Sequence, residues 1–207
     1  MTAQAGDTLF SEPAACKTAL RREARWLRSA LPRRQRITAA RLATRALLRA
    51  LPRCCSIAIY LSVRSELSTE PLRRALQRAG HRVHAPVILP ARRLCFTPLY
   101  GNTRLKRGRH ALPQPAATCA LKTARKLDVI LLPLLAFDRY GVRLGNGGGY
   151  YDRALAQPRI GGRPRLIGYA YAAQETAALP CEAWDVRLDG VVTECGLRHF
   201  SGIRKRP

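Results

Sequence analysis

The stretch "LDVILLPLLAFDRYGVRLGNGGGYYDRAL", from Leu127 to Leu155, joins an apolar segment, a glycine-rich loop and the start of a helix. Residues 127–137 are rich in branched apolar side chains, which is typical of a short strand buried on both faces of a sheet. The loop follows directly, and residues 152–157 are predicted to begin a helix that leaves it. A strand followed by a loop and a helix is the repeating unit of α/β folds.

The segments on both sides continue this alternation. Helices are predicted over residues 11–31, 33–51 and 68–80, and the first two end at Pro32 and Pro52 because proline cannot continue a helix. Strands are predicted at residues 54–62, 81–88, 94–100, 165–172 and 187–194, the last of these being the final strand, while 101–115 is a stretch marked by glycine and proline. The fold class predicted is α/β: a single domain with a mostly parallel sheet and helices on both faces, a Rossmann-like three-layer sandwich. This domain is expected over residues 13–200, between a flexible leader (1–12) and a basic tail (201–207).

The chain is strongly basic. Its 207 residues carry a net charge of +24 at pH 7, and 32 of the 37 basic residues are arginine. Such a charge attracts polyanions, so non-specific nucleic-acid binding is expected, and one interpretation is a nucleic-acid- or ribosome-associated protein. The other is an ordinary surface with arginines spread over it. Neither a zinc-finger spacing nor an aromatic RNA-binding strand is present, which favours the second interpretation.

The sequence also predicts a soluble, cytoplasmic protein with no membrane partner. The longest apolar run, residues 129–137, is too short to cross a membrane. The first ten residues lack the apolar segment of a secretory signal. The seven cysteines form no CxxC pair and no zinc-binding spacing, which is typical of a reducing compartment.

Ligands of open α/β sheets bind outside the carboxyl ends of the strands. Three chemically rich segments are expected at that edge: the loop after Tyr60, which carries Glu66, the loop after Phe137, and the region around Asp185. The N-terminal helix is able to close over the same edge. The sequence therefore predicts one site built from segments that are far apart in the chain.

The glycine loop fits no standard nucleotide-binding signature. A P-loop needs lysine and then serine or threonine after its last glycine, and a dinucleotide fingerprint needs a glycine where Tyr150 stands. Successive glycines nevertheless let backbone N–H groups converge on an anion, and Arg143 can fork onto phosphate oxygens. Asp152 can hold Mg²⁺, and Tyr150 and Tyr151 offer flat faces to a heterocycle. The alternative is a tight turn with a capping aspartate.

Other candidates are weaker by themselves. Lys17 and Arg21 share one helix face and can clamp phosphate, or can belong to a solvated basic face. Glu66 can bind substrate, or can be a surface residue or a cap partner. The four histidines, His81, His84, His110 and His199, lie near no nucleophile signature and are expected to be structural or exposed.

Read together, these segments resemble the 5-formyltetrahydrofolate cyclo-ligase family, also called methenyltetrahydrofolate synthetase. The strongest match is the stretch 127–155 with its Gly-x-Gly-Tyr-Tyr-Asp-Arg loop. "KTALR" (17–21), "IAIYLSVRSELSTEPL" (57–72), "ALPQP" (111–115) and "AWDVRLDGVVTE" (183–194) are similar to further family segments, in the family's order. The resemblance covers residues 17–195.

The resemblance implies ATP-dependent cyclisation of 5-formyltetrahydrofolate to 5,10-methenyltetrahydrofolate with Mg²⁺, yielding ADP and phosphate. Arg143 and Asp152 match catalytic positions. ATP-binding positions match Lys17, Arg21, Arg143, Leu144, Gly145, Asn146, Gly147, Gly148, Gly149, Tyr150 and Tyr151. Folate-binding positions match Leu61, Glu66, His110, Tyr150 and Tyr151, and magnesium ligands match Asp152 and Asp185, with Asp189 as the alternative to Asp185.

The resemblance further implies a monomer that binds a reduced folate, with or without a polyglutamate tail. Two other functions stay open at this point. One is a nucleic-acid- or ribosome-associated protein on the same fold with lost or secondary activity. The other is a related α/β enzyme that acts on sugar phosphates or coenzyme A.

Overall fold

The computed structural model describes residues 12–157 and 159–200. The leader expected at 1–12, apart from Glu12, and the tail at 201–207 therefore lie outside the described residues. The helices are α1 (Glu12–Ala30), α2 (Arg33–Ala50), α3 (Glu70–Arg78) and α4 (Tyr150–Leu155). The strands are β1 (Ser56–Ala58), β2 (Arg82–Ile88), β3 (Leu94–Pro98), β4 (Leu105–Arg107), β5 (Pro113–Pro115), β6 (Val129–Leu132), β7 (Ala136–Asp138), β8 (Arg143–Leu144), β9 (Arg165–Tyr169), β10 (Glu175–Thr176), β11 (Gly190–Thr193) and β12 (Gly196–His199).

A seven-stranded sheet forms the centre of the fold, in the order β12-β11-β9-β6-β1-β2-β3. The five inner strands pair in parallel, while β3 and β12 pair antiparallel at the two edges. The predicted α/β fold with a mostly parallel sheet is therefore confirmed.

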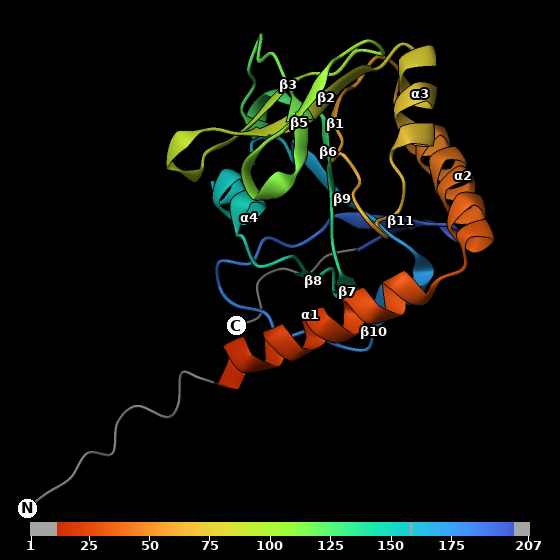
Figure 1. The fold of residues 1–207 in the computed structure, drawn as a ribbon, viewed down its shortest axis with the longest axis vertical. Helices are drawn as coiled ribbons and strands as arrows, with labels where there is room; N and C mark the ends of the chain where they lie inside the picture. Colours follow the sequence, from red (N-terminus) through yellow and green to blue (C-terminus); the bar gives the residue numbers. More distant parts are fainter. Residues whose placement is uncertain (1–11, 158, 201–207) are drawn as a thin grey trace, which may run out of the picture.

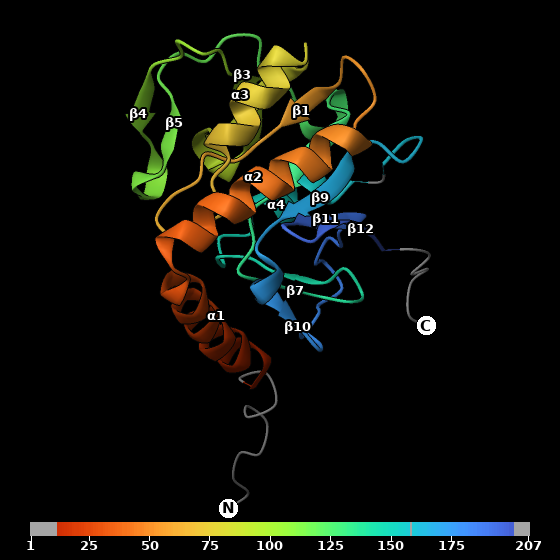
Figure 2. The same cartoon turned by 90° about the vertical axis from the view of Figure 1, so that its right-hand side faces the viewer.

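Helices α2 and α3 cover one face of this sheet, and α4 lies on the opposite side (Figure 1, Figure 2). The face of α2 that packs on the sheet carries Ala39, Ala40, Ala43 and Leu47, which recur at helical spacing and are almost fully buried. A second buried cluster, which includes Phe137 and Leu155, fills the other face. Helices thus lie on both faces, but the second face carries a short helix of six residues together with loops and small strands.

The segment 127–137 differs from its prediction. It was expected to be one strand, but it divides into β6 in the large sheet and β7 in a separate three-stranded sheet, β10-β7-β8. Pro133 stands at the break, where it has no N–H to donate to a neighbouring strand. The break turns the chain from the centre of the large sheet towards the glycine loop.

Two further elements were missed. The strand predicted at 187–194 is not the last, because the chain reverses after Thr193 and β12 pairs back onto β11. Gly196 makes this possible with a φ of +125°, which side-chain-bearing residues rarely adopt. The glycine- and proline-marked stretch at 101–115 contains the hairpin of β4 and β5, which pairs from Leu105 to Pro115.

Helix α1 crosses the edge of the molecule where β7, β8 and β10 lie (Figure 1). The N-terminal helix therefore lies beside the segment that leads into the glycine loop, and its Arg21 contacts that loop. Among the described helices, none is long and apolar enough to cross a membrane.

Candidate active site

A cleft of about 1240 Å³ opens between α1, the loop after β1, the β4–β5 hairpin and the glycine loop. Every residue that the sequence assigned to the site lines it: Lys17, Arg21, Leu61, Glu66, His110, Arg143, Leu144, Gly145, Asn146, Gly147, Gly148, Gly149, Tyr150, Tyr151, Asp152 and Asp185. Segments at both ends of the chain meet here because the carboxyl ends of parallel strands share one sheet edge.

The glycine loop connects β8 to α4, and its backbone geometry requires glycine. Gly147 and Gly149 have φ values of +94° and +62°, in the left-handed region. A Cβ atom at Gly148 would lie 2.8 Å from the ring of Tyr150, closer than a real Cβ can approach. The loop is joined to α1, since the Arg21 Nε donates a hydrogen bond to the Gly145 carbonyl at 3.1 Å. The loop is therefore packed closely against Tyr150 and α1, and it lines the cleft.

Arg143 and Asp152 contact each other across this loop. The Arg143 Nη2 donates to the Asp152 Oδ1 at 2.5 Å, and the Arg143 side chain is 6% exposed. The Val186 N–H lies 3.4 Å from the same carboxylate oxygen. The Nε of Arg143 is buried and has no hydrogen-bond partner among the described residues. Since buried donors are almost always paired, this atom marks a position where a further acceptor fits.

Lys17 also lines the cleft, and two carboxylates of the segment 182–185 hold its side chain. Its Nζ donates to the Glu182 Oε2 at 2.7 Å and to the Asp185 Oδ2 at 2.8 Å. Burial alone would lower the pKa of Lys17, but the hydrogen bonds to Asp185 and Glu182 outweigh it, so the pKa is raised above its usual value. The ammonium group therefore stays charged. Glu182 was not found from the sequence, because no motif marks it.

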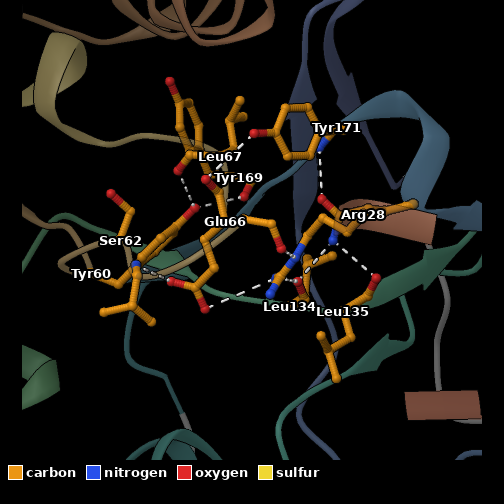
Figure 3. A network of polar contacts seen from close by, with 12 residues as sticks. Arg28, Tyr60, Ser62, Glu66, Leu67, Leu134, Leu135, Tyr169 and Tyr171 are labelled. Atoms are coloured by element: carbon orange, nitrogen blue, oxygen red, sulfur yellow. Dashed lines mark hydrogen bonds and ion pairs between the residues drawn. The ribbon is translucent and has the colours of Figure 1, made fainter. Parts of the chain in front are cut away.

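Glu66 lines the cleft from the loop after β1 (Figure 3). Its side chain is 8% exposed, and its Oε2 accepts a hydrogen bond from the Val63 N–H at 3.0 Å. Burial raises the pKa of Glu66, while the Val63 N–H and the Arg28 guanidinium act in the opposite direction. Burial also raises the pKa of Tyr151 well above its usual value, so this phenol stays protonated.

Arg28 is a second residue that the sequence did not single out. It is buried on α1, and its Nη1 lies 4.0 Å from the Glu66 Oε1. Two other groups of the cleft were also missed. Trp26 and Trp184, the only tryptophans of the chain, line it and are both exposed.

His110 lies at the tip of the β4–β5 hairpin, where its φ is +57°. Its Nε2 is 2.9 Å from the hydroxyl of Tyr150, so the hairpin reaches the first residue of α4. Of the other histidines, His84 is buried in β2, and burial lowers its pKa. The expectation of structural or exposed histidines agrees with these positions.

Asp189, the alternative to Asp185, is placed differently. Its carboxylate pairs with Arg159 and accepts the Leu166 N–H at 2.7 Å, and it does not belong to the cleft lining. The structure thus brings Asp185 towards Asp152 and Lys17, and uses Asp189 to hold the start of β9.

Comparison with known proteins shows the relationship of the chain. The family model described as "5-formyltetrahydrofolate cyclo-ligase family" matches residues 13–194. The chain belongs to the 5-formyltetrahydrofolate cyclo-ligase family. The 5-formyltetrahydrofolate cyclo-ligase of Escherichia coli K12 is 40% identical over 141 residues, which cover 67% of this chain and 77% of that protein.

Solved structures of cyclo-ligase relatives share the fold. The 5,10-methenyltetrahydrofolate synthetase of Aquifex aeolicus matches with a TM-score of 0.74 at 27% sequence identity, and the match covers 92% of this chain and 96% of that protein. The 5,10-methenyltetrahydrofolate synthetase of Mycoplasma pneumoniae matches with a TM-score of 0.69 at 25% identity, over 86% of this chain and 98% of that protein. The resemblance predicted from the sequence, and the interpretation of the chain as an enzyme, are both confirmed.

The side chains of this cyclo-ligase cleft suit a polyphosphate and a magnesium ion. The buried Nε of Arg143, which has no partner among the described residues, and the backbone N–H groups of the glycine loop are donors for phosphate oxygens. Asp152 and Asp185 supply carboxylate oxygens, which Mg²⁺ prefers. No group of three or more His, Cys, Asp or Glu able to hold a metal occurs in the described part of the chain. Two carboxylates leave coordination positions for water and phosphate, as is usual for Mg²⁺.

Proposed function

We propose that this chain catalyses the ATP- and Mg²⁺-dependent cyclisation of 5-formyltetrahydrofolate to 5,10-methenyltetrahydrofolate, with release of ADP and phosphate. The observation that carries the proposal is that all the residues matched to the family's ATP, folate and magnesium positions line one cleft. They come from α1, the loop after β1, the hairpin, the glycine loop, α4 and the segment at 182–185.

One side of the cleft would bind the triphosphate. The glycine loop offers backbone N–H groups, and the guanidinium groups of Arg21 and Arg143 line the same cleft. Lys17 adds an ammonium group that its neighbours keep charged. Asp152 and Asp185 would hold Mg²⁺, which supplies positive charge where negative charge develops during phosphoryl transfer.

The other side would bind the folate. Glu66 would accept hydrogen bonds from the N–H edge of the pterin, as a carboxylate oxygen does well in a buried position. Leu61, Tyr150 and Tyr151 would provide apolar and aromatic faces for the ring system. His110 would hold the ring of Tyr150 in place against the folate, because its Nε2 lies 2.9 Å from the Tyr150 hydroxyl.

The chemistry needs positioning more than acid–base catalysis. The formyl oxygen attacks the γ-phosphorus of ATP, and ADP leaves. The neighbouring folate nitrogen then captures the activated carbon, loses its proton, and the phosphate departs with the former formyl oxygen. The residues of this chain hold the two substrates in line and neutralise charge on the transferred group, which is how most phosphoryl-transfer enzymes work.

The test is an absorbance assay for the methenyl product. Purified protein with Mg²⁺, ATP and 5-formyltetrahydrofolate is expected to form it, with ATP hydrolysis that depends on the folate. Asp152→Asn is expected to fold normally and to lose most turnover. Absence of product from folded wild-type protein would overturn the proposal, and wild-type turnover in Asp152→Asn would overturn the role of that residue.

The polyglutamate tail, the monomeric state and the cytoplasmic location stay predictions from the sequence. The same holds for the alternative function as a nucleic-acid- or ribosome-associated protein. If the charge of +24 is spread over the surface, nucleic-acid binding will be sequence-blind and will fall steeply with salt. Specific, salt-resistant binding would instead favour that alternative.

A further inference from the structure

Four basic residues of α1 line the cleft, Lys17, Arg21, Arg25 and Arg28, and three of them lie close together around the helix axis. These three are Lys17, Arg21 and Arg28. With 3.6 residues per turn, their spacings of four and seven residues place them within about 40° of one another around the helix axis. At about 1.5 Å per residue, they extend along roughly 16 Å of helix. The helix can therefore reach the phosphate side and the folate side of the cleft at the same time.

Lys17 and Arg21 line the part of the cleft proposed to bind phosphate. Arg28 instead contacts the loop that carries Glu66. The side chain of Arg28 is 7% exposed, so its charge is almost completely removed from water. Its Nε donates to the Ser65 Oγ at 3.2 Å, and its Nη1 donates to the Leu134 carbonyl at 3.4 Å. A buried guanidinium without an anionic neighbour is costly, and the carboxylate nearest to it is Glu66, with 4.0 Å between Nη1 and Oε1.

The groups around this pair are themselves fixed (Figure 3). The Leu134 carbonyl also accepts a hydrogen bond from the Gln174 Nε2 at 2.9 Å, which holds the acceptor of Arg28 in place. The loop that carries Glu66 is closed at its base by the Tyr60 hydroxyl, which donates to the Leu67 carbonyl at 2.9 Å. Glu66 is thus held between its own loop, through the Val63 N–H, and α1, through Arg28.

We propose that Arg28 is a positioning residue for Glu66: its buried guanidinium holds the carboxylate charged and aimed at the pterin edge of the substrate. This inference rests on the proposed function, since that function assigns Glu66 to the folate side. Arg28 itself acts through Glu66 and not on the reacting atoms. It makes α1 a contributor to folate binding as well as to ATP binding.

The decisive experiment is a double-mutant cycle on substrate binding. Binding of 5-formyltetrahydrofolate without nucleotide is measured by the fluorescence of Trp26 and Trp184, which both line the cleft. Arg28→Gln is expected to weaken binding about tenfold in the wild-type background and less than about twofold in the Glu66→Gln background, because coupled residues are not additive. Equal factors in the two backgrounds, or no effect in the wild-type background, would overturn the proposal.

Further variants separate positioning from a general effect on folding. Arg28→Lys keeps the charge and is expected to restore most of the affinity that Arg28→Gln loses. Arg22→Gln is the control, since Arg22 is exposed on the same helix and does not line the cleft. It should bind folate like the wild type. ATP affinity should change less than about twofold in Arg28→Gln, because positions without shared contacts act independently. Equal losses of ATP and folate affinity would indicate a distorted helix and overturn the proposal.

The pH dependence gives an independent readout. The charged and titratable groups that face Glu66 are Arg28 from α1, Arg64 in its own loop, Tyr60 after β1, Tyr151 from α4 and Tyr171 after β9. Removal of the Arg28 charge lets burial raise the pKa of Glu66 further, so the acid limb of folate binding should move to higher pH in Arg28→Gln. An unshifted acid limb would overturn the proposal.

The failure of the proposed function and the failure of the Arg28 inference can be told apart. If the wild-type protein formed no methenyl product, the proposed function would fail. If it formed the product but the double-mutant cycle were additive, the Arg28 inference alone would fail.

Discussion

Lys17→Met tests how strongly α1 is tied to the C-terminal half of the cleft. Methionine keeps the apolar stem of lysine but removes the ammonium group that contacts Glu182 and Asp185. These two carboxylates then lie beside each other with no cation between them. The side chains of Lys17, Glu182 and Asp185 are 9%, 34% and 22% exposed, so the cluster is neither fully buried nor fully solvated.

The expected magnitude follows from this intermediate exposure. A surface ion pair contributes about 0–1 kcal/mol, and breaking a buried pair by removing one partner costs about 3–5 kcal/mol. We expect Lys17→Met to lower the free energy of unfolding by about 2 kcal/mol, between these two limits. For a chain of this size about 1 kcal/mol corresponds to a change in Tm of about 2–4 °C, so Tm should fall by about 4–8 °C.

The assay is thermal unfolding followed by circular dichroism at neutral pH and at low and high salt. Lys126→Met is the matched control, because Lys126 is exposed and the substitution removes the same charge from the surface. Its Tm should stay close to that of the wild type. A Tm for Lys17→Met that is also within about 1 °C of the wild type would refute the reasoning, because it would mean that solvent already compensates the three charges.

Three further variants address other parts of the structure. Gly148→Ala places a Cβ 2.8 Å from the ring of Tyr150 and should lower kcat/KM about tenfold by displacing that ring, with Tm nearly unchanged; unaltered kinetics would contradict the close packing of the loop. His110→Ala removes the contact to the Tyr150 hydroxyl and should raise the KM for the folate about threefold without changing that for ATP, which steady-state kinetics would show. Arg73 lowers the pKa of Glu70 to about 2, from 4.5, so Glu70→Gln should cost less than about 1 kcal/mol at pH 7. A carboxyl group whose pKa is lower in the folded than in the unfolded state stabilises the fold at pH values above the unfolded pKa. The difference in free energy of unfolding between the wild type and Glu70→Gln should therefore disappear as the pH falls from 4.5 towards about 2. Denaturant titrations that show this difference growing at acid pH would exclude the pairing.

Much of the site could be predicted because its parts are local motifs. Four glycines within 145–149, the two tyrosines and Asp152 follow one another in the chain, and their spacing predicts either an anion-binding loop or a tight turn before a helix. Lys17 and Arg21 were linked to them by helical periodicity and by the family resemblance. The rule that ligands bind at the carboxyl ends of parallel strands then placed Glu66 and Asp185 at the same edge.

The sequence by itself determined the α/β class, the position of the loop and the family, because strand and helix periodicities and turn residues are properties of neighbouring residues. Only the tertiary structure decided which charges pair. Glu182 lies 165 residues from Lys17, and the carbonyl that Arg28 contacts lies 106 residues away. The break at Pro133 and the return strand β12 likewise depend on which neighbour a strand finds in space. Burial and long-range pairing set these features, and neither can be read from the local order of residues.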